Sequence, residues 1–163
     1  MVIARKLKAF LDERKVTYHV LKHHEKFTSQ EIAQSLHVPG QMLAKVVMVK
    51  ASGKLHMAVL PADVLVDLTA FARAVGVKEA ALASEAEFKD AFPDCELGSM
   101  PPFGNLYDVP VVVDRSLTAD EQIVFEAGNH HEAVKLAYAD FARLVRPQVG
   151  EIGRRARVGS TSS

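Results

Sequence analysis

The stretch LAKVVMVKASGKLHMAVLP, residues 43–61, decides the fold of this chain. Its two halves, 43–50 and 54–61, are rich in apolar and β-branched residues, and Ala-Ser-Gly separates them. Two such runs joined by a short glycine-containing loop are typical of a β-hairpin. The sequence therefore predicts a hairpin with a three-residue turn, the clearest local element in the chain.

Before the hairpin, the sequence predicts a helix, a strand and a second helix. Apolar residues at helical spacing open the chain, and a strand-like run follows at 16–21. A capping-box pattern, Thr28 with Glu31, then opens a helix that Pro39-Gly40 ends.

After the hairpin, helical spacing covers 65–76, and a second capping box opens a helix over about 85–91. A last helix is predicted from Asp140, its expected N-cap, to about residue 145. Three strand-like runs lie between these helices, at 109–114, 122–128 and 133–138.

This order of elements predicts an α+β fold, a single mixed α/β domain with a central, mostly antiparallel sheet flanked by helices. No internal repeat and no Gly/Ser linker divides it. The domain is expected over residues 1–150, and the composition of residues 151–163 predicts a disordered tail.

The composition limits the class of protein. The chain has 163 residues, of which 48% are hydrophobic and 25% charged, as in a soluble globular domain. No apolar run reaches the roughly 20 residues of a membrane helix, and Arg and Lys interrupt the apolar positions near the N-terminus. We therefore expect a cytoplasmic protein with no membrane partner.

Net charge and cysteine content exclude further classes. Lys and Arg together equal Asp and Glu, which removes the general attraction to phosphate backbones that DNA-binding domains use. A nucleic-acid partner must be held locally, and no DNA partner is expected. Cys95 is the single cysteine, so neither a disulfide framework nor a cysteine-based metal cluster can form within the chain.

The common catalytic motifs are missing. The chain has no nucleophile elbow, phosphate-binding loop, dinucleotide fingerprint or zinc-protease helix, so no cofactor is expected. In each histidine pair, His23-His24 and His130-His131, extended backbone directs the two side chains to opposite faces, which disfavours a metal site. Acidic neighbours would raise the thiol pKa of Cys95, which favours a partly buried small side chain over a nucleophile.

Two positions in the strands and turns admit both a structural and a functional interpretation. Lys45 lies in an apolar run, where its amine must reach either water or a bound anion such as a phosphate or carboxylate. His130 follows the turn residues Gly128 and Asn129, and is either an exposed turn histidine or part of a site.

The loop GSMPPFG, 98–104, is unusually restricted in its backbone. Prolines hold such a loop rigid, and Gly98 would let the chain approach a ligand closely. Pro101 and Pro102 have no N–H, so the candidate backbone donors are Gly98, Ser99, Met100, Phe103 and Gly104.

Taken together, four stretches of this sequence resemble the YbaK-type aminoacyl-tRNA deacylases, which are related to the editing domain inserted in bacterial prolyl-tRNA synthetases. The similarity extends to about residue 146, with the parts in the family's order and spacing. The stretches are TSQEIAQSL with LAKVVMVK (28–50), AVLPADVLVDLTAFARAVG (58–76), GSMPPFGNLYDVPVVVD (98–114) and AGNHHEAVKLAYADFARLV (127–145).

The resemblance implies hydrolysis of the ester that joins a wrong amino acid to tRNA. It implies catalytic roles for Lys45 and for Gly98, Ser99 and Met100 of the loop, and water attack without a side-chain nucleophile. The substrate-binding residues that it implies are Pro101, Pro102, Phe103, Gly104, Gly128, Asn129 and His130.

The expected partner is the acceptor end of a mischarged tRNA, with an aminoacyl-tRNA synthetase as a further candidate. The AGNHH turn favours Ala on proline tRNA, with Cys, Ser and Thr left open. The arginines within 143–157 either contact phosphates or belong to a solvated tail. Two rivals remain: a non-catalytic module that binds aminoacyl-tRNA or a synthetase, and a hydrolase of small activated amino acids.

Overall fold

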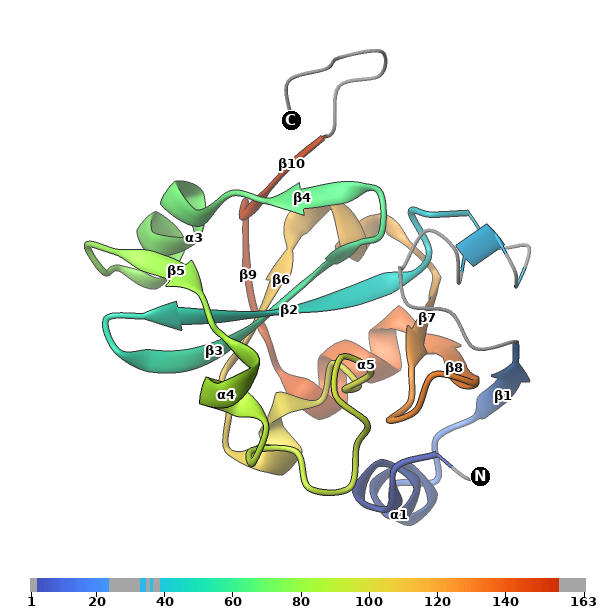
Figure 1. Cartoon of the computed structure of the whole chain (residues 1–163). Coiled ribbons are helices and arrows are strands. Elements are labelled where there is room, and N and C mark those ends of the chain that lie inside the picture. Colours follow the sequence, from blue (N-terminus) through green and yellow to red (C-terminus); the bar gives the residue numbers. More distant parts are fainter. Residues whose placement is uncertain (1–2, 24–32, 35, 37–38, 156–163) are drawn as a thin grey trace.

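The predicted hairpin lies in the middle of a five-stranded sheet (Figure 1). The computed structural model describes residues 3–23, 33–34, 36 and 39–155. Strands β2 (Ala44–Ala51) and β3 (Lys54–Pro61) pair antiparallel, with Lys45 opposite Leu60, so the predicted hairpin is confirmed.

The turn of this hairpin has two residues rather than the predicted three. Strand β2 continues through Ala51, which leaves Ser52 and Gly53 to form the turn with φ angles of 48° and 78°. Positive φ at both turn positions matches the right-handed twist of the strands, which explains why the shorter turn is preferred.

Three more strands complete the sheet in the order β5-β2-β3-β6-β9. Strand β5 (Ala80–Leu82) is antiparallel to β2, whereas β6 (Val111–Asp114) runs parallel to β3 and β9 (Gln148–Gly150) runs parallel to β6.

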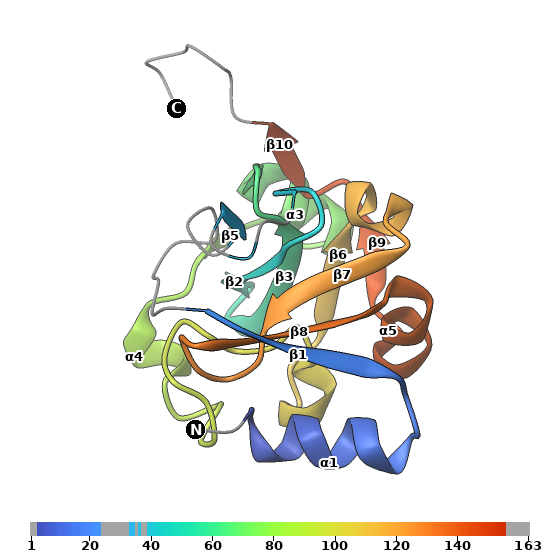
Figure 2. The ribbon, with the colours of Figure 1, turned by 90° about the vertical axis from the view of Figure 1, so that its right-hand side faces the viewer.

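A second, three-stranded sheet covers the first and faces the viewer in Figure 2. Strands β1 (Tyr18–Lys22), β8 (Glu132–Ala137) and β7 (Gln122–Glu126) are antiparallel in that spatial order. A bridge between Leu43 and Val124 joins the two sheets just before β2 begins. The expected α+β fold with mostly antiparallel pairing is confirmed.

A short ribbon at the edge of the molecule involves the C-terminal segment. Strand β4 (Val64–Val66) pairs antiparallel with β10 (Gly153–Arg155). Residues 153–155 of the stretch 151–163, for which composition predicted disorder, thus form a strand. Residues 156–163 lie outside the described part of the chain.

Helices pack at the ends and faces of the sheets. None of those in the described residues is long and apolar enough to span a membrane. The α-helices are α1 (Arg5–Glu13), α3 (Leu68–Val75), α4 (Glu85–Phe88) and α5 (Tyr138–Val145), and the short 3₁₀ helices are η1 (Gly104–Tyr107) and η2 (Arg115–Ala119).

Several helix boundaries differ from those expected. Helix α3 begins late because residues 64–66 pair as β4, and Asp67 then caps it by accepting a hydrogen bond from the Ala70 N–H. Asp140 lies inside the first turn of α5, whose N-cap is Ala137. The capping box of α4 is confirmed, and the helix predicted after Thr28 falls largely outside the described residues.

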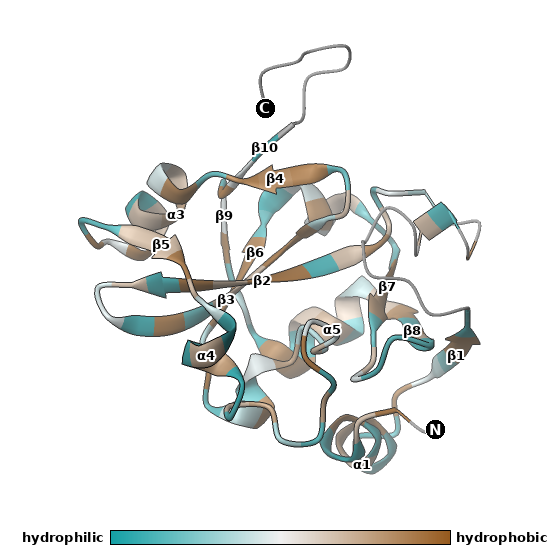
Figure 3. Ribbon diagram, in the orientation of Figure 1, coloured by the Kyte–Doolittle hydropathy of each residue, from teal (hydrophilic) through white to brown (hydrophobic). Residues whose placement is uncertain are grey.

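The core lies between the two sheets and is rich in phenylalanine. The buried ring of Phe103 lies 5.5 Å from that of Phe125, 5.5 Å from that of Phe141 and 6.2 Å from that of Phe10, measured between centroids. Figure 3 shows hydrophobic residues along β4 and the middle of β2, and hydrophilic residues over much of α1. This packing joins both sheets, α1 and α5 into one body.

Candidate active site

A small cavity of about 170 Å³ opens where the start of β2, the loop after α4 and the end of β7 meet. It is lined by Leu43, Ala44, Lys45, Val46, Gly98, Met100 and Glu126. Three residues predicted as catalytic from the sequence, Lys45, Gly98 and Met100, are therefore brought together. Their catalytic role stays a prediction.

Lys45 is a half-buried cation in the wall of this cavity. Its Nζ atom lies 3.5 Å from the carbonyl oxygen of Ala62. Burial lowers the pKa of Lys45 from its ordinary value, and the nearby charge of Asp63 partly opposes this shift. A partly desolvated ammonium with few partners is suited to bind an anionic group of a ligand.

The loop 98–104 enters the cavity only with its first part. Gly98 has a φ of 88°, a conformation that other residues rarely adopt. Ser99 is fully buried, and both its N–H and its hydroxyl donate to the Glu96 carbonyl oxygen, at 3.1 and 2.8 Å. The Ser99 N–H is therefore engaged within the loop, which leaves Gly98 and Met100 as the backbone donors at the cavity.

The second part of the loop, Pro101 to Gly104, is buried and lies outside the cavity lining. The Phe103 ring belongs to the aromatic core. At Gly104 an added Cβ would lie 2.5 Å from the Val109 carbonyl oxygen, so this glycine is needed for close packing. These residues lie behind the cavity wall, and their contact with substrate stays a prediction.

The turn 128–132 is fixed by the side chain of Asn129. Its Oδ1 accepts hydrogen bonds from the N–H groups of His131 and Glu132, at 2.8 and 2.9 Å, and its Nδ2 donates to Glu132 Oε1 at 3.2 Å. An amide that bonds its own turn in this way stabilises the backbone. Asn129 thus positions the turn.

Gly128 ties the turn to two other segments. Its N–H donates to the Ser99 carbonyl oxygen at 2.8 Å, and its own carbonyl accepts from the Glu96 N–H at 2.7 Å. Its φ is 103°, and a Cβ added here would lie only 2.7 Å from the Ala4 Cβ, so this position requires glycine. The turn and the loop therefore form one connected wall.

His130 joins this wall to β7. Its N–H donates to Glu96 Oε1 at 2.9 Å, its Nε2 lies 3.0 Å from the Leu97 carbonyl oxygen, and its Nδ1 lies 3.4 Å from Glu126 Oε2. Only 15% of the side chain is exposed. His130 is therefore not the exposed turn histidine of the structural interpretation.

Glu126 is the residue of this site that the sequence interpretation missed. It ends strand β7, lines the cavity and has 17% of its side chain exposed. Burial and then the nearby charge of Glu96 raise its pKa to about 8. An acid at the end of an otherwise apolar strand, QIVFE, was the available signal.

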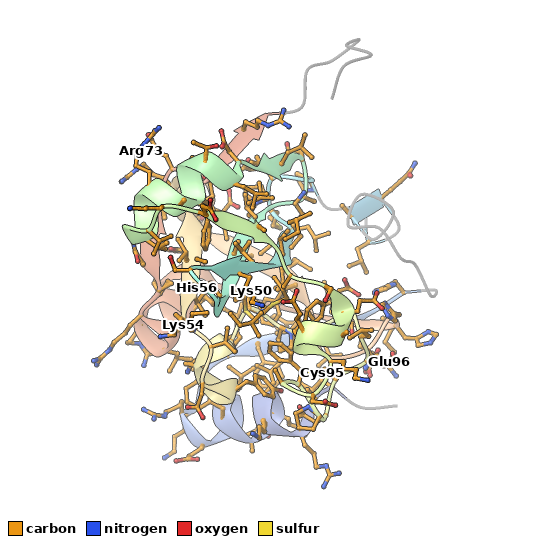
Figure 4. All side chains as sticks on the ribbon, turned by 60° about the vertical axis from the view of Figure 1, so that its left-hand side comes forward. Lys50, Lys54, His56, Arg73, Cys95 and Glu96 are labelled. Atoms are coloured by element: carbon orange, nitrogen blue, oxygen red, sulfur yellow. The ribbon has the colours of Figure 1, made fainter. Side chains whose placement is uncertain are left out.

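Cys95 lies outside the cavity lining. Figure 4 labels it next to Glu96, on the same loop. Its Sγ lies 3.5 Å from the Tyr107 hydroxyl, and burial raises the thiol pKa to about 12. The thiol therefore stays protonated and weakly nucleophilic. Within the described residues, no three His, Cys, Asp or Glu side chains gather to hold a metal ion.

Two curated relatives are similar to this chain over much of its length. The multifunctional Ser/Thr-tRNA deacylase ProXp-y of Escherichia coli strain K12 is 35% identical over 101 residues, which are 61% of this chain and 60% of that protein. The chain thus spans about three fifths of the E. coli relative. The prolyl-tRNA editing protein ProX of Acetoanaerobium sticklandii is 25% identical over 144 residues, 85% of this chain and 87% of that protein.

Solved structures show the same fold at low sequence identity. A hypothetical protein superposes with a TM-score of 0.82 at 19% identity, covering 92% of this chain and all of the other. A candidate trans-editing enzyme for prolyl tRNA synthetase superposes with a TM-score of 0.79 at 18% identity, covering 93% and 96%.

The aminoacyl-tRNA editing domain family matches residues 23–144, a range that contains every residue lining the cavity. This confirms the family resemblance expected from the sequence. With more than half of its length matched and the fold shared with solved structures, the chain belongs to the aminoacyl-tRNA editing domain family.

Proposed function

We propose that this chain is a trans-editing hydrolase that deacylates mischarged aminoacyl-tRNA. The observation that carries the proposal is the small cavity in which Lys45 meets the backbone of Gly98 and Met100, within a chain of the editing-domain family. The names of the E. coli and A. sticklandii relatives, a tRNA deacylase and a prolyl-tRNA editing protein, support the same activity.

The chemistry needs no side-chain nucleophile. An aminoacyl ester is already activated, so the site must orient a water molecule and stabilise the charge that develops on the carbonyl oxygen. The N–H groups of Gly98 and Met100 are the candidate donors to that oxygen. Water attacks the carbonyl carbon, the bond to the ribose oxygen breaks, that oxygen takes a proton, and the free amino acid and tRNA leave.

Lys45 contacts a phosphate or ribose oxygen of the terminal nucleotide in this proposal. Its half-buried ammonium lies 3.5 Å from the carbonyl oxygen of Ala62 and near the charge of Asp63. A terminal phosphate would give this ammonium a charged hydrogen-bond acceptor. Lys45 thereby orients the substrate and does not act as the base.

The amino acid removed is small, because the cavity is small. A hydrophobic pocket discriminates by only about 1–3 kcal/mol per methylene group, so size exclusion serves best as a second sieve. Ala, Ser, Thr and Cys are the candidates, on proline tRNA. Because the E. coli relative is named a Ser/Thr-tRNA deacylase, seryl- and threonyl-tRNA should be tested as substrates alongside alanyl-tRNA.

The tRNA is held at its acceptor end, since the chain has no net charge to attract the whole molecule. An aminoacyl-tRNA synthetase is a further candidate partner, supported by the prolyl-tRNA editing names of relatives. Arg154 of β10 is exposed and is available for a phosphate contact.

The proposal is tested by incubating the protein with proline tRNA carrying radiolabelled Ala, Ser, Thr, Cys or Pro and following release of the amino acid. We expect release of at least one small amino acid and retention of Pro. Release from none of them, with binding retained, would support the binding module instead. Equal action on short aminoacyl-adenosine esters would support the hydrolase of small activated amino acids.

A further inference from the structure

The cavity holds one acid that the proposed hydrolysis does not use. Among the described residues that line it, Glu126 is the acidic side chain, Lys45 is the basic one, and the others are apolar or glycine. Only 17% of the Glu126 side chain is exposed, and a carboxyl buried to this extent is costly to ionise without a partner. Its position therefore points to a cationic ligand group.

The orientation of the Glu126 carboxyl is set by His130. The Leu97 carbonyl oxygen can only accept, so the His130 Nε2 atom, 3.0 Å away, carries the hydrogen. The Nδ1 atom lies 3.4 Å from Glu126 Oε2, an approach that a proton between the two atoms favours. The Oε2 atom is thus directed at His130, and Oε1 is the candidate oxygen for a ligand contact.

The substrate supplies a matching cation. An aminoacyl ester carries one, the α-ammonium, on the carbon next to the reacting carbonyl. We infer, on the basis of the proposed function, that Glu126 forms the subsite for the α-amino group of the aminoacyl ester. Lys45 and Glu126 then bind opposite ends of the substrate, the nucleotide and the amino acid.

The proton affinities of the two groups agree with this assignment. Glu126 faces His130, Glu96 and the cavity that Lys45 shares, and burial with the Glu96 charge raises its pKa to about 8. An α-amino group has a pKa of about 7.7–8.0. Near neutral pH both groups are largely protonated when apart, and their contact releases one proton to water and forms a charge-assisted hydrogen bond between carboxylate and ammonium.

The test compares two substrates that differ only in the amino group. Alanyl-tRNA is deaminated with nitrous acid to lactyl-tRNA, in which a hydroxyl replaces the amine at nearly the same volume. The kcat/KM for deacylation is measured on both esters, after subtraction of spontaneous hydrolysis, for the full chain, for Glu126→Gln and for Glu121→Gln. Glu121 is exposed and directly precedes β7, so its variant is a matched control.

For the unaltered chain we expect alanyl-tRNA to be preferred over lactyl-tRNA by about 10- to 100-fold, the range of one charge-assisted hydrogen bond. Glu126→Gln should lose this preference, because its kcat/KM for alanyl-tRNA falls while its kcat/KM for lactyl-tRNA stays within about two-fold of that of the unaltered chain. Glu121→Gln should keep the preference.

Two outcomes would overturn the inference. Equal slowing of both esters in Glu126→Gln would indicate a general base or a purely structural role, and an unchanged preference would show that Glu126 does not meet the amine. If the unaltered chain deacylates none of the alanyl-, seryl-, threonyl- and cysteinyl-tRNAs, the proposed function fails instead. The two failures are therefore distinguishable.

Discussion

The two ends of strand β2 border cavities that differ in volume, in their charged groups and in how deeply those groups are buried. At its start, Lys45 is half-buried in a cavity of about 170 Å³. At its far end, Lys50 borders a broad hollow of about 870 Å³ that also includes Arg73. Figure 4 shows Lys50, Lys54, His56 and Arg73 on the side of the molecule that carries this hollow.

The larger hollow is the less specific of the two. Its charged side chains are solvated or paired: Arg73 is exposed, and Lys50 Nζ lies 2.5 Å from Glu87 Oε2, with 45% of the lysine side chain exposed. Exposed ion pairs of this kind contribute little to stability or recognition. The small cavity instead holds an amine and a carboxyl, those of Lys45 and Glu126, that are partly desolvated, and such groups mark functional sites.

The largest expected effect separates the two lysines of this strand. Lys45→Ala should lower kcat/KM for deacylation by about 100-fold, because a buried charge-assisted contact to the terminal nucleotide is lost. Lys50→Ala should remain within about two-fold of the unaltered chain, since its amine is exposed. Deacylation assays on the best mischarged tRNA measure kcat/KM for both variants. Equal losses in the two would contradict a special role for the start of β2.

The next prediction compares two glycines with similar backbones. Gly98 and Gly53 have φ angles of 88° and 78°, and alanine at either position should destabilise the fold by about 1 kcal/mol. Only Gly98→Ala should also slow deacylation, by about 10-fold, because it shifts a backbone donor at the cavity. Thermal unfolding and kinetics are measured together, and an equal loss of activity in Gly53→Ala would refute the assignment of the loop.

A third prediction concerns pH and stability. Glu126 has a folded pKa of about 8 against 4.5 ordinarily, so the folded state binds the extra proton between these values. The contribution of Glu126 to the free energy of unfolding is therefore fully present below about pH 4.5. It falls as the pH rises to about 8, by about 1.4 kcal/mol for each pH unit between these values. Glu126→Gln should raise the unfolding temperature at pH 8 and leave it nearly unchanged at pH 4.5. Parallel curves for the two chains would contradict the burial of this acid.

The smallest expected effect is at the broad hollow. Arg73→Ala should change KM for tRNA by less than about two-fold and leave its salt dependence unaltered. A lost phosphate contact would reduce the slope of log affinity against log salt by about one. Such a reduction would show that the tRNA extends over this end of β2, so that the broad hollow also takes part in binding.

The sequence predicts the fold better than the site. The hairpin, the capping box of α4 and most strands follow from short-range patterns that local physics controls. The start of α3 could not be predicted, because Val64–Val66 pair with β10 from the far end of the chain. Nor could the place of Asp140, whose helix begins earlier at Tyr138.

The site depends still more on long-range contacts. Lys45, Gly98 and Met100 were predicted from the family resemblance, and the structure places them around one cavity. Glu126 was missed because its proximity to His130 and Glu96 arises only when β7, the turn and the loop assemble. The engagement of the Ser99 N–H with Glu96 likewise has no signature in the sequence.

The contact between Gly128 and Ala4 has a practical consequence for work with the protein. The Ala4 N–H also donates to the Ala127 carbonyl oxygen at 2.8 Å, so the amino end of the chain is attached to the turn that carries His130. In Figure 1 helix α1 and strand β10 lie at opposite ends of the molecule. A purification tag or fluorescent fusion is therefore better joined at the carboxyl end, where it does not disturb the contact between Ala4 and the turn.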